Sequence, residues 1–272
     1  MTLLVGVAHG SKDPASQDVV ERLLAKAAAL RPGLRTTAAY VDNASPSVRS
    51  ALASLDEDAV VLPLLLTPAS HSKTDVAAAV QEARTAGRRL RYGRPLGPHP
   101  ALVQVLVQRL AEASVDASDP VVLVAGGAID PDANAQVAAT ARLLLEAGEW
   151  PTVDIAFAST ARPGVPTALE RLRSQGFSRA AVARYFLGPG HLPRLVERQA
   201  RQVDGLEVLV TEPLGAADEL ARLVLERYDE ALGGDVRMNC DVCLYRTPMR
   251  GREHLVGAPQ EPHDHPDDLP AT

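Results

Sequence analysis

The chain has 272 residues, of which 46% are hydrophobic, and carries a formal net charge of −6 with a pI near 5.7. That length allows one large domain or two of ordinary size. The acidic balance argues against a nucleic-acid-binding protein, which is normally basic. No apolar run approaches the roughly 20 residues that cross a bilayer, and the first residues lack the basic region of a signal peptide. We expect a cytoplasmic protein with neither nucleic acid nor membrane as a partner.

Strand-like and helix-like segments alternate along the first part of the chain. Residues 3–8 form an apolar run that predicts a buried strand, and Asp13-Pro14 marks the start of a helix over 15–30. Further strands are predicted at 34–41, 59–66 and 89–92, and further helices at 46–55, 73–86 and 100–113. Pro46 is expected in the first turn of its helix. This order is typical of a parallel sheet with helices on both faces.

The same pattern then begins again. Strands are predicted at 121–125, 153–158, 180–187 and 206–211, and helices at 132–147, 163–174, 191–202 and 216–232. Asp130-Pro131 repeats Asp13-Pro14 after 117 positions, and residues 185–189 align with residues 64–68. We predict an α/β fold of two tandem similar lobes, residues 1–115 and 120–235, each a parallel sheet flanked by helices. A Cys/His-containing tail, residues 236–272, is expected to be partly disordered.

Two histidines follow strands of the first predicted lobe. His9 comes directly after the first strand and His71 after the third. Because ligands of open parallel sheets bind at the carboxyl ends of the strands, both imidazoles are expected at one edge. Together they can hold a divalent transition ion and leave positions open for exchange. Either histidine alone is as well explained as a loop or capping residue. In the second lobe Gly126 and Leu192 stand at the equivalent positions, so the chemistry is expected in the first lobe.

One carboxylate lies four residues after the second of these histidines. Asp75 could orient the imidazole of His71 by accepting its second N–H. An acidic residue in the first turn of a helix is the slightly favoured explanation. Other polar or basic residues stand near strand ends and could receive an anionic ligand, although each alone is typical of solvated surface: Ser11, Lys12, Arg162, Arg184 and His191.

Several familiar motifs are absent or incomplete. No glycine-rich phosphate-binding loop and no Gly-x-Ser-x-Gly turn occurs, which disfavours a nucleotide-binding protein or a serine hydrolase. Both cysteines, Cys240 and Cys243, form a C-x-x-C in the tail, a spacing suited to soft metals. The later histidines do not fit a zinc finger, and two thiolates are too few for a four-cysteine iron–sulfur cluster.

Four segments together resemble one family. They are H-G-S after the first strand, L-L-L-T-P-A-S-H-S-K-T-D, D-P-D-A-N-A and the tail motif M-N-C-D-V-C-L-Y-R. The combination is similar to the sirohydrochlorin chelatases, in particular the long two-lobed CbiX or SirB type. Ala69 departs from a glycine that is frequent in the family, and Gly126-Gly127-Ala128 lacks the G-S often kept there. One active centre is therefore expected.

The resemblance implies a class II chelatase fold and a metal-chelatase (lyase) activity. The reaction would be ATP-independent insertion of Fe²⁺ or Co²⁺ into sirohydrochlorin, for sirohaem or cobalamin biosynthesis. The family's active-site histidines correspond to His9 and His71, which we expect to bind the metal and relay protons. Cys240 and Cys243 correspond to cysteines associated with an iron–sulfur cluster in some long members.

The substrate's carboxylates give four polar side chains a rationale as anchors: Ser11, Lys12, Arg162 and Arg184. The choice among Fe²⁺, Co²⁺ and Ni²⁺ stays open because all three accept imidazole. The oligomeric state is open too, and a homodimer is compatible with the sequence. The alternatives are a non-catalytic metal carrier of the same fold, an inactive paralogue, and a two-lobed ligand-binding protein, which the missing signal peptide disfavours.

Overall fold

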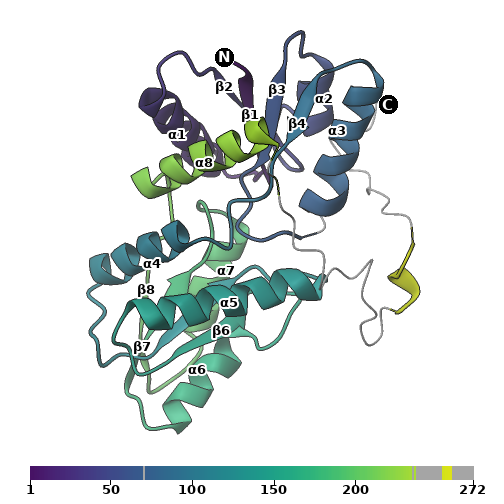
Figure 1. Cartoon of the computed structure of the whole chain (residues 1–272). Coiled ribbons are helices and arrows are strands. Elements are labelled where there is room, and N and C mark those ends of the chain that lie inside the picture. The colour runs from purple at the N-terminus through teal and green to yellow at the C-terminus, as the bar shows by residue number, and fades with distance from the viewer. Residues whose placement is uncertain (70, 235, 237–252, 259–272) are drawn as a thin grey trace.

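Each half of the chain forms a four-stranded parallel sheet. The computed structural model describes residues 1–69, 71–234, 236 and 253–258, and Figure 1 shows the two sheets in separate lobes. The first sheet has the order β2-β1-β3-β4 and consists of β1 (Leu3–Ala8), β2 (Thr36–Tyr40), β3 (Ala59–Pro63) and β4 (Leu90–Tyr92). The second has the order β6-β5-β7-β8 and consists of β5 (Val121–Ala125), β6 (Val153–Phe157), β7 (Arg179–Arg184) and β8 (Glu207–Val210). The predicted fold class is confirmed.

Helices cover both faces of each sheet. They are α1 (Pro14–Leu30), α2 (Val48–Ala53), α3 (Val76–Thr85), α4 (Pro100–Glu112), α5 (Pro131–Ala147), α6 (Val165–Ser174), α7 (His191–Ala200) and α8 (Asp218–Gly233). A π-helical turn, η1 (His71–Asp75), precedes α3, and a short 3₁₀ turn, η2 (Glu253–Leu255), lies near the C-terminus. Helix α1 buries one face, because helical spacing places these side chains on the same side: Val19, Val20, Leu23, Leu24 and Ala27. Among the described residues, no helix is both long enough and apolar enough to cross a membrane.

Helix α2 begins later than the sequence analysis predicts. Pro46 follows a cis peptide bond and lies before the helix, which starts at Val48. The Oγ atom of Ser47 accepts a hydrogen bond from the Ser50 N–H at 3.2 Å, so Ser47 is the N-cap. The prediction that Pro46 occupies the first helical turn was therefore wrong. Serine satisfies a helix N–H, whereas proline at this position belongs to the preceding turn.

The strand registers confirm the internal repeat. Leu4 of β1 is paired with Val60 of β3, and Val121 of β5 is paired with Ala181 of β7. The first members of these pairs are 117 positions apart and the second members 121 positions apart, as the aligned motifs require. The two lobes are therefore related residue by residue, and equivalent positions can be compared directly.

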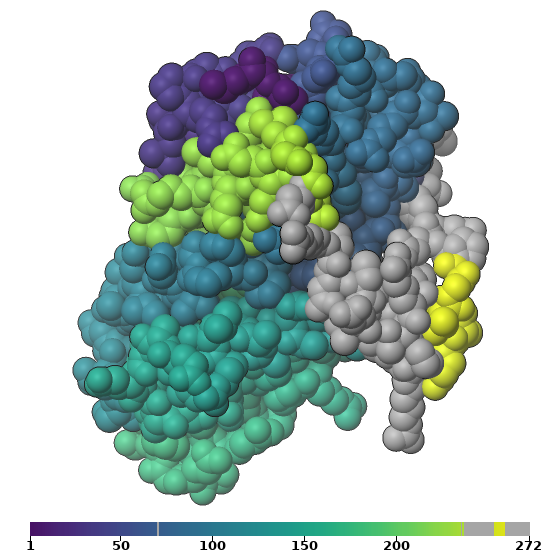
Figure 2. Space-filling model, viewed as in Figure 1, coloured from purple at the N-terminus to yellow at the C-terminus, as the bar shows by residue number. Residues whose placement is uncertain are grey.

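Two helices are exchanged between the lobes. Helix α4 leaves the first sheet and packs against α5 and β7, while α8 returns from the second sheet to pack against α1, β3 and β4. Figures 1 and 2 show light-green α8 lying beside the purple N-terminal elements. The predicted boundaries at 115 and 120 separate the two sheets in sequence, but each sheet is completed by a helix from the other half. One hydrophobic cluster consequently spans both lobes.

Candidate active site

The two predicted histidines meet at the carboxyl edge of the first sheet. His9 follows β1 directly, and His71 opens the η1 turn beyond β3, which is the parallel neighbour of β1. Their ring centroids are 4.6 Å apart, with an angle of 30° between the ring planes. His9 is exposed and His71 is partly exposed, so both imidazoles can be reached from solvent. The structure thus brings together the two side chains that the strand order places at one edge.

Gly10 allows the backbone to turn sharply after His9. Its φ is +94°, in the left-handed region that glycine tolerates best. A Cβ atom at Gly10 would lie 1.7 Å from the carbonyl oxygen of Asp42, so no other residue fits there without a shift. The Asp42 N–H also donates a hydrogen bond to the His9 carbonyl at 2.8 Å. Close packing of these two loops therefore holds the backbone of His9 in place.

Asp75 orients the second imidazole. Its Oδ2 atom lies 2.7 Å from Nδ1 of His71, and the Asp75 side chain is buried. Although Asp75 stands at the start of α3, its carboxylate makes no capping hydrogen bond to that helix. The orienting contact considered for Asp75 is therefore formed, and its position at the start of α3 also fits the helix-terminal explanation. An Nδ1–H donated to Asp75 leaves Nε2 of His71 with its lone pair directed elsewhere.

A partly buried tyrosine supports the same turn. The hydroxyl of Tyr92 donates a hydrogen bond to the carbonyl of Ser72 at 2.5 Å. Burial, together with the negative charge of Asp75, raises the pKa of Tyr92, which therefore stays a protonated donor. Tyr92 and Asp75 together hold the segment that carries His71.

Two imidazoles alone would leave most of a metal's coordination positions open. Within the ranges that the structure describes, no group of three or more His, Cys, Asp or Glu side chains is placed to hold a metal ion. A structural zinc site is normally closed by four protein ligands. The His9–His71 pair suits an ion that is bound, exposed to another ligand and passed on.

The structure reveals a buried ion cluster that the sequence analysis missed. Lys73, two residues after His71, crosses to the second lobe, where its Nζ lies 2.7 Å from Asp130 and 2.8 Å from Asp132. The side chain of Lys73 is 7% exposed and those of both aspartates are 0% exposed. A compact ammonium group can lie between two carboxylates in this way. No sequence signal singled out Lys73, because the other two lysines of the chain, Lys12 and Lys26, are exposed.

Two of the predicted anchors lie on the loop after His9. Ser11 uses its Oγ to accept the Asp13 N–H at 3.1 Å, and Lys12 is exposed. The second lobe approaches this loop closely, because a Cβ atom at Gly190 would lie 3.4 Å from the Ser11 Oγ. These residues therefore stand where the two lobes meet.

The two predicted arginines have different surroundings. Arg162 is exposed on the turn before α6. Arg184 is buried at the end of β7, where its guanidinium donates to the carbonyl of Thr211 and lies 3.2 Å from the carboxylate of Glu212. Arg162 is thus open to an added anion, whereas Arg184 already has partners within its own lobe.

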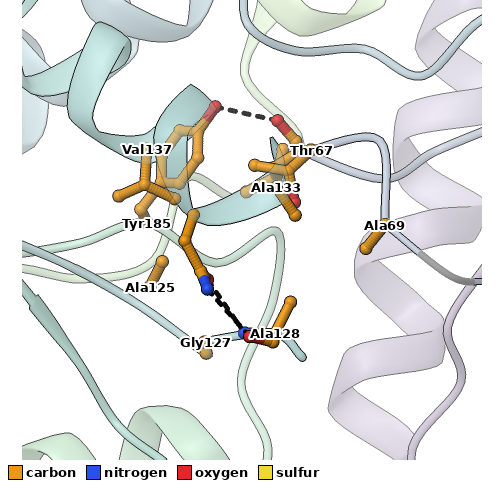
Figure 3. Close-up of a pocket in the computed structure, with 11 residues that line it drawn as sticks. Thr67, Ala69, Ala125, Gly127, Ala128, Ala133, Val137 and Tyr185 are labelled. Atoms are coloured by element: carbon orange, nitrogen blue, oxygen red, sulfur yellow. Dashed lines mark hydrogen bonds between the residues drawn. The ribbon is translucent and has the colours of Figure 1, made fainter. Parts of the chain in front are cut away.

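A pocket of about 140 Å³ lies between the lobes, where Leu66, Thr67 and Ala69 of the first lobe face the β5–α5 turn of the second. The Tyr185 hydroxyl donates a hydrogen bond to the Leu66 carbonyl at 3.0 Å, and the Asn134 side chain bonds to the N–H and the carbonyl of Ala128. Figure 3 draws these hydrogen bonds as dashed lines that start from Tyr185 and Ala128. Ligand sites for drug-sized molecules commonly measure about 300–1,000 Å³. The pocket is therefore too small to enclose a large macrocycle.

The tail cysteines, Cys240 and Cys243, lie outside the described residues, as do His263 and His265. Of the remaining histidines, His99 is the N-cap of α4 and accepts the Ala101 N–H through Nδ1 at 3.1 Å. That contact places His99 at the start of α4 as a capping residue.

Comparison with known proteins identifies the family. The profile described as CbiX matches residues 3–113 and 120–231. The chain belongs to the CbiX family. This agrees with the resemblance drawn from the four sequence segments, and the two matched stretches correspond to the two halves of the repeat.

Relatives of this CbiX-family protein include curated enzymes and solved structures. It is 30% identical over 270 residues to a sirohydrochlorin cobaltochelatase of Priestia megaterium, covering 94% of this chain and 87% of the relative. It is 27% identical over 195 residues to a sirohydrochlorin ferrochelatase of the same organism, covering 68% and 73%. The structure of SirB from Bacillus subtilis with Fe³⁺ superposes with a TM-score of 0.74 at 22% identity, covering 86% of this chain and 98% of that one. The two-lobed chelatase fold is thereby shared.

Proposed function

We propose that this CbiX-family protein is a metal chelatase that inserts a divalent ion, Fe²⁺ or Co²⁺, into sirohydrochlorin without ATP. The observation that carries the proposal is the His9–His71 pair, whose rings lie 4.6 Å apart at the sheet edge. The names of its relatives, a cobaltochelatase and a ferrochelatase, support the same reaction. The absence of a phosphate-binding loop motif from the sequence fits a reaction that needs no nucleotide.

The proposed reaction exchanges one metal ion for two protons. His9 and His71 bind the incoming ion through neutral nitrogens, and the macrocycle nitrogens replace them one after another. As each pyrrole N–H loses its proton, a released imidazole accepts it and passes it to solvent. The ion contributes two positive charges and two protons leave, so the charge balances. His9 is the more exposed of the two rings and is suited to exchange with solvent.

Asp75 acts through His71 in this proposal. In the tautomer that donates its Nδ1–H to Asp75, across the 2.7 Å contact, Nε2 is the nitrogen whose lone pair can bind the ion. Asp75 is thus a positioning residue, which sets the tautomer and the orientation of the His71 ring.

The substrate is a polycarboxylate, so exposed cations near the site have a role. We propose Lys12 and Arg162 as anchors for its carboxylates, with Ser11 as a neighbouring polar contact on the loop after His9. Arg184 is the least accessible of the predicted anchors, because it would have to exchange Glu212 for the substrate.

An anaerobic absorbance assay tests the function. Sirohydrochlorin would be mixed with the protein and Fe²⁺, Co²⁺ or Ni²⁺ in turn, beside the double variant His9→Ala/His71→Ala. The matched control is His99→Asn, which removes an imidazole elsewhere and keeps a residue able to cap α4. We expect multiple turnovers from the wild type and the control and none from the double variant. Metal binding without turnover above the uncatalysed rate would instead indicate a metal carrier.

The iron–sulfur cluster is a separate proposal that rests on Cys240 and Cys243 and on family resemblance. Iron and acid-labile sulfide would be measured in anaerobically purified protein and in Cys240→Ser/Cys243→Ser. Equal contents in both proteins would refute it.

A further inference from the structure

Two ion pairs cross between the lobes at positions that the repeat makes equivalent. Asp13 and Asp130 are the N-caps of α1 and α5 and are 117 positions apart. Lys73 and Arg194 are 121 positions apart, the offset that relates β3 to β7. Lys73 of the first lobe binds Asp130 at 2.7 Å, and Arg194 of the second lobe binds Asp13 at 2.5 Å. Each lobe therefore holds the first helix cap of the other.

The two crossings differ in their exposure to water. Lys73 and Asp130 are 7% and 0% exposed, and Asp132 adds a second carboxylate. Arg194 and Asp13 are 55% and 19% exposed, with a single carboxylate. A buried ion pair cannot release one partner without leaving a desolvated charge, whereas an exposed pair is only weakly favourable. The buried Lys73–Asp130–Asp132 cluster therefore stays formed, whereas the exposed Arg194–Asp13 ion pair can exchange Asp13 for another carboxylate.

The exchangeable pair adjoins the active site. Asp13 lies four residues after His9, and its carboxylate caps α1 by accepting the Ala15 N–H. Arg194 lies on the first turn of α7, whose N-cap, Gly190, stands against Ser11. The guanidinium of Arg194 is therefore held at the junction of the two lobes beside the loop that carries His9.

We propose that Arg194 binds a carboxylate of the substrate, and that in the free protein its guanidinium is paired with Asp13 instead. A carboxylate of the macrocycle takes the place of the Asp13 carboxylate on the guanidinium, with two parallel N–H···O hydrogen bonds available. This exchange breaks the Arg194–Asp13 ion pair between the lobes. The lobes therefore separate at that point, while the Lys73–Asp130–Asp132 cluster keeps them together elsewhere along the junction. The inference rests on the proposed function, since it takes its ligand from that reaction.

Hydrogen bonding to Arg194 lowers the pKa of Asp13, which keeps the carboxylate ionised and able to compete for the guanidinium. Asp13 thereby limits binding to ligands whose carboxylates can displace it.

Two substitutions separate this inference from a merely structural ion pair, because they should act in opposite directions. Arg194→Gln removes the anchor, so the Kd for metal-free sirohydrochlorin should rise about 5–10-fold. Asp13→Asn keeps a residue able to cap α1 and removes the competing charge, so the Kd should fall about 3-fold. The double variant should bind like Arg194→Gln alone, and Arg194→Lys should recover part of the affinity. Titration of the macrocycle's absorbance and fluorescence measures each value.

The control breaks another exposed ion pair. Lys26→Gln removes the 2.6 Å contact of Lys26 with Asp218 between α1 and α8 and should leave the Kd unchanged. In the insertion assay, Arg194→Gln should raise the KM for sirohydrochlorin and leave kcat within about 2-fold. If Arg194→Gln and Asp13→Asn weaken binding equally, or neither changes it, the inference is wrong while the proposed function stands. If the wild type neither binds nor metallates sirohydrochlorin, both are wrong.

Discussion

Replacing Lys73 with methionine tests how much the buried ion cluster between the two lobes contributes to the stability of the protein. The substitution keeps the length of the side chain and removes the ammonium group that lies 2.7 and 2.8 Å from two carboxylates. Asp130 would retain the Asp132 N–H as a donor and Asp132 would retain Gln136, but both would lose the cation. Removing one partner of a buried pair costs about 3–5 kcal/mol of stability. For a protein of this size that corresponds to a fall in Tm of about 10 °C.

Thermal unfolding of three variants measures this contribution. Lys73→Met should unfold about 10 °C below the wild type. Lys26→Gln breaks an exposed pair, so its free energy of unfolding should differ from that of the wild type by less than about 1 kcal/mol. In Lys73→Met/Asp130→Asn/Asp132→Asn the unpaired charges are gone, so more than half of the loss should be recovered. A Tm within about 2 °C of the wild type for Lys73→Met would refute the fastening role.

The pH dependence of that difference has a definite sign. Burial alone would lower the pKa of Lys73, but the hydrogen bonds to Asp130 and Asp132 outweigh it and raise that pKa above the ordinary 10.5. A raised pKa in the folded state means that the contribution is fully present below the unfolded value and is lost above the folded one. The Tm difference between wild type and Lys73→Met should therefore be constant from about pH 6 to 9 and should shrink only above about 10.5.

Three further substitutions address the site and its supports. Asp75→Asn should lower kcat for metal insertion about 10–100-fold with little change in Tm, because it weakens the contact that orients His71; an unchanged kcat would contradict the role of Asp75. Gly10→Ala should lower the Tm much more than Gly33→Ala. Both glycines have positive φ, but only at Gly10 would a Cβ lie 1.7 Å from a carbonyl oxygen. Equal losses of Tm would show that backbone conformation alone matters. Burial lowers the pKa of His99 below 6.5, so the stability of the protein should fall as the pH drops below about 6.5. His99→Asn should make the decrease of Tm with falling pH less steep. An identical slope in the variant and the wild type would refute this role of His99.

Local sequence patterns were sufficient for most of the secondary structure. Leu3–Ala8 and Val121–Ala125 have the predicted bounds, because a short apolar run followed by a turn leaves few alternatives to a buried parallel strand. Two Asp-Pro pairs correctly marked the starts of α1 and α5. The start of α2 was misplaced because proline occurs both in turns and in first helical turns, and only the Ser47 cap decides between them.

The proximity of His9 and His71 was also predictable, for a topological reason. Both residues follow strands of one parallel sheet, and the carboxyl ends of such strands share an edge. The contact between His71 and Asp75 was only one of two explanations beforehand. Spacing of four residues allows either an orienting carboxylate or a helix-terminal charge, and the choice depends on how the η1 turn is wound.

By itself, the sequence determined what depends on neighbours along the chain, namely the strands and helices, the internal repeat and the family. The strand order that it implies also placed the two histidines at one sheet edge. Only the tertiary structure decided which helix completes which sheet and which charges meet across the lobes. Lys73 and Asp130 are 57 positions apart, and Arg194 and Asp13 are 181 apart. No local pattern links such residues, because their contact depends on the exchange of α4 and α8 and on the orientation that this exchange gives the two lobes. The buried Lys73–Asp130–Asp132 cluster and the exposed Arg194–Asp13 ion pair both result from that packing.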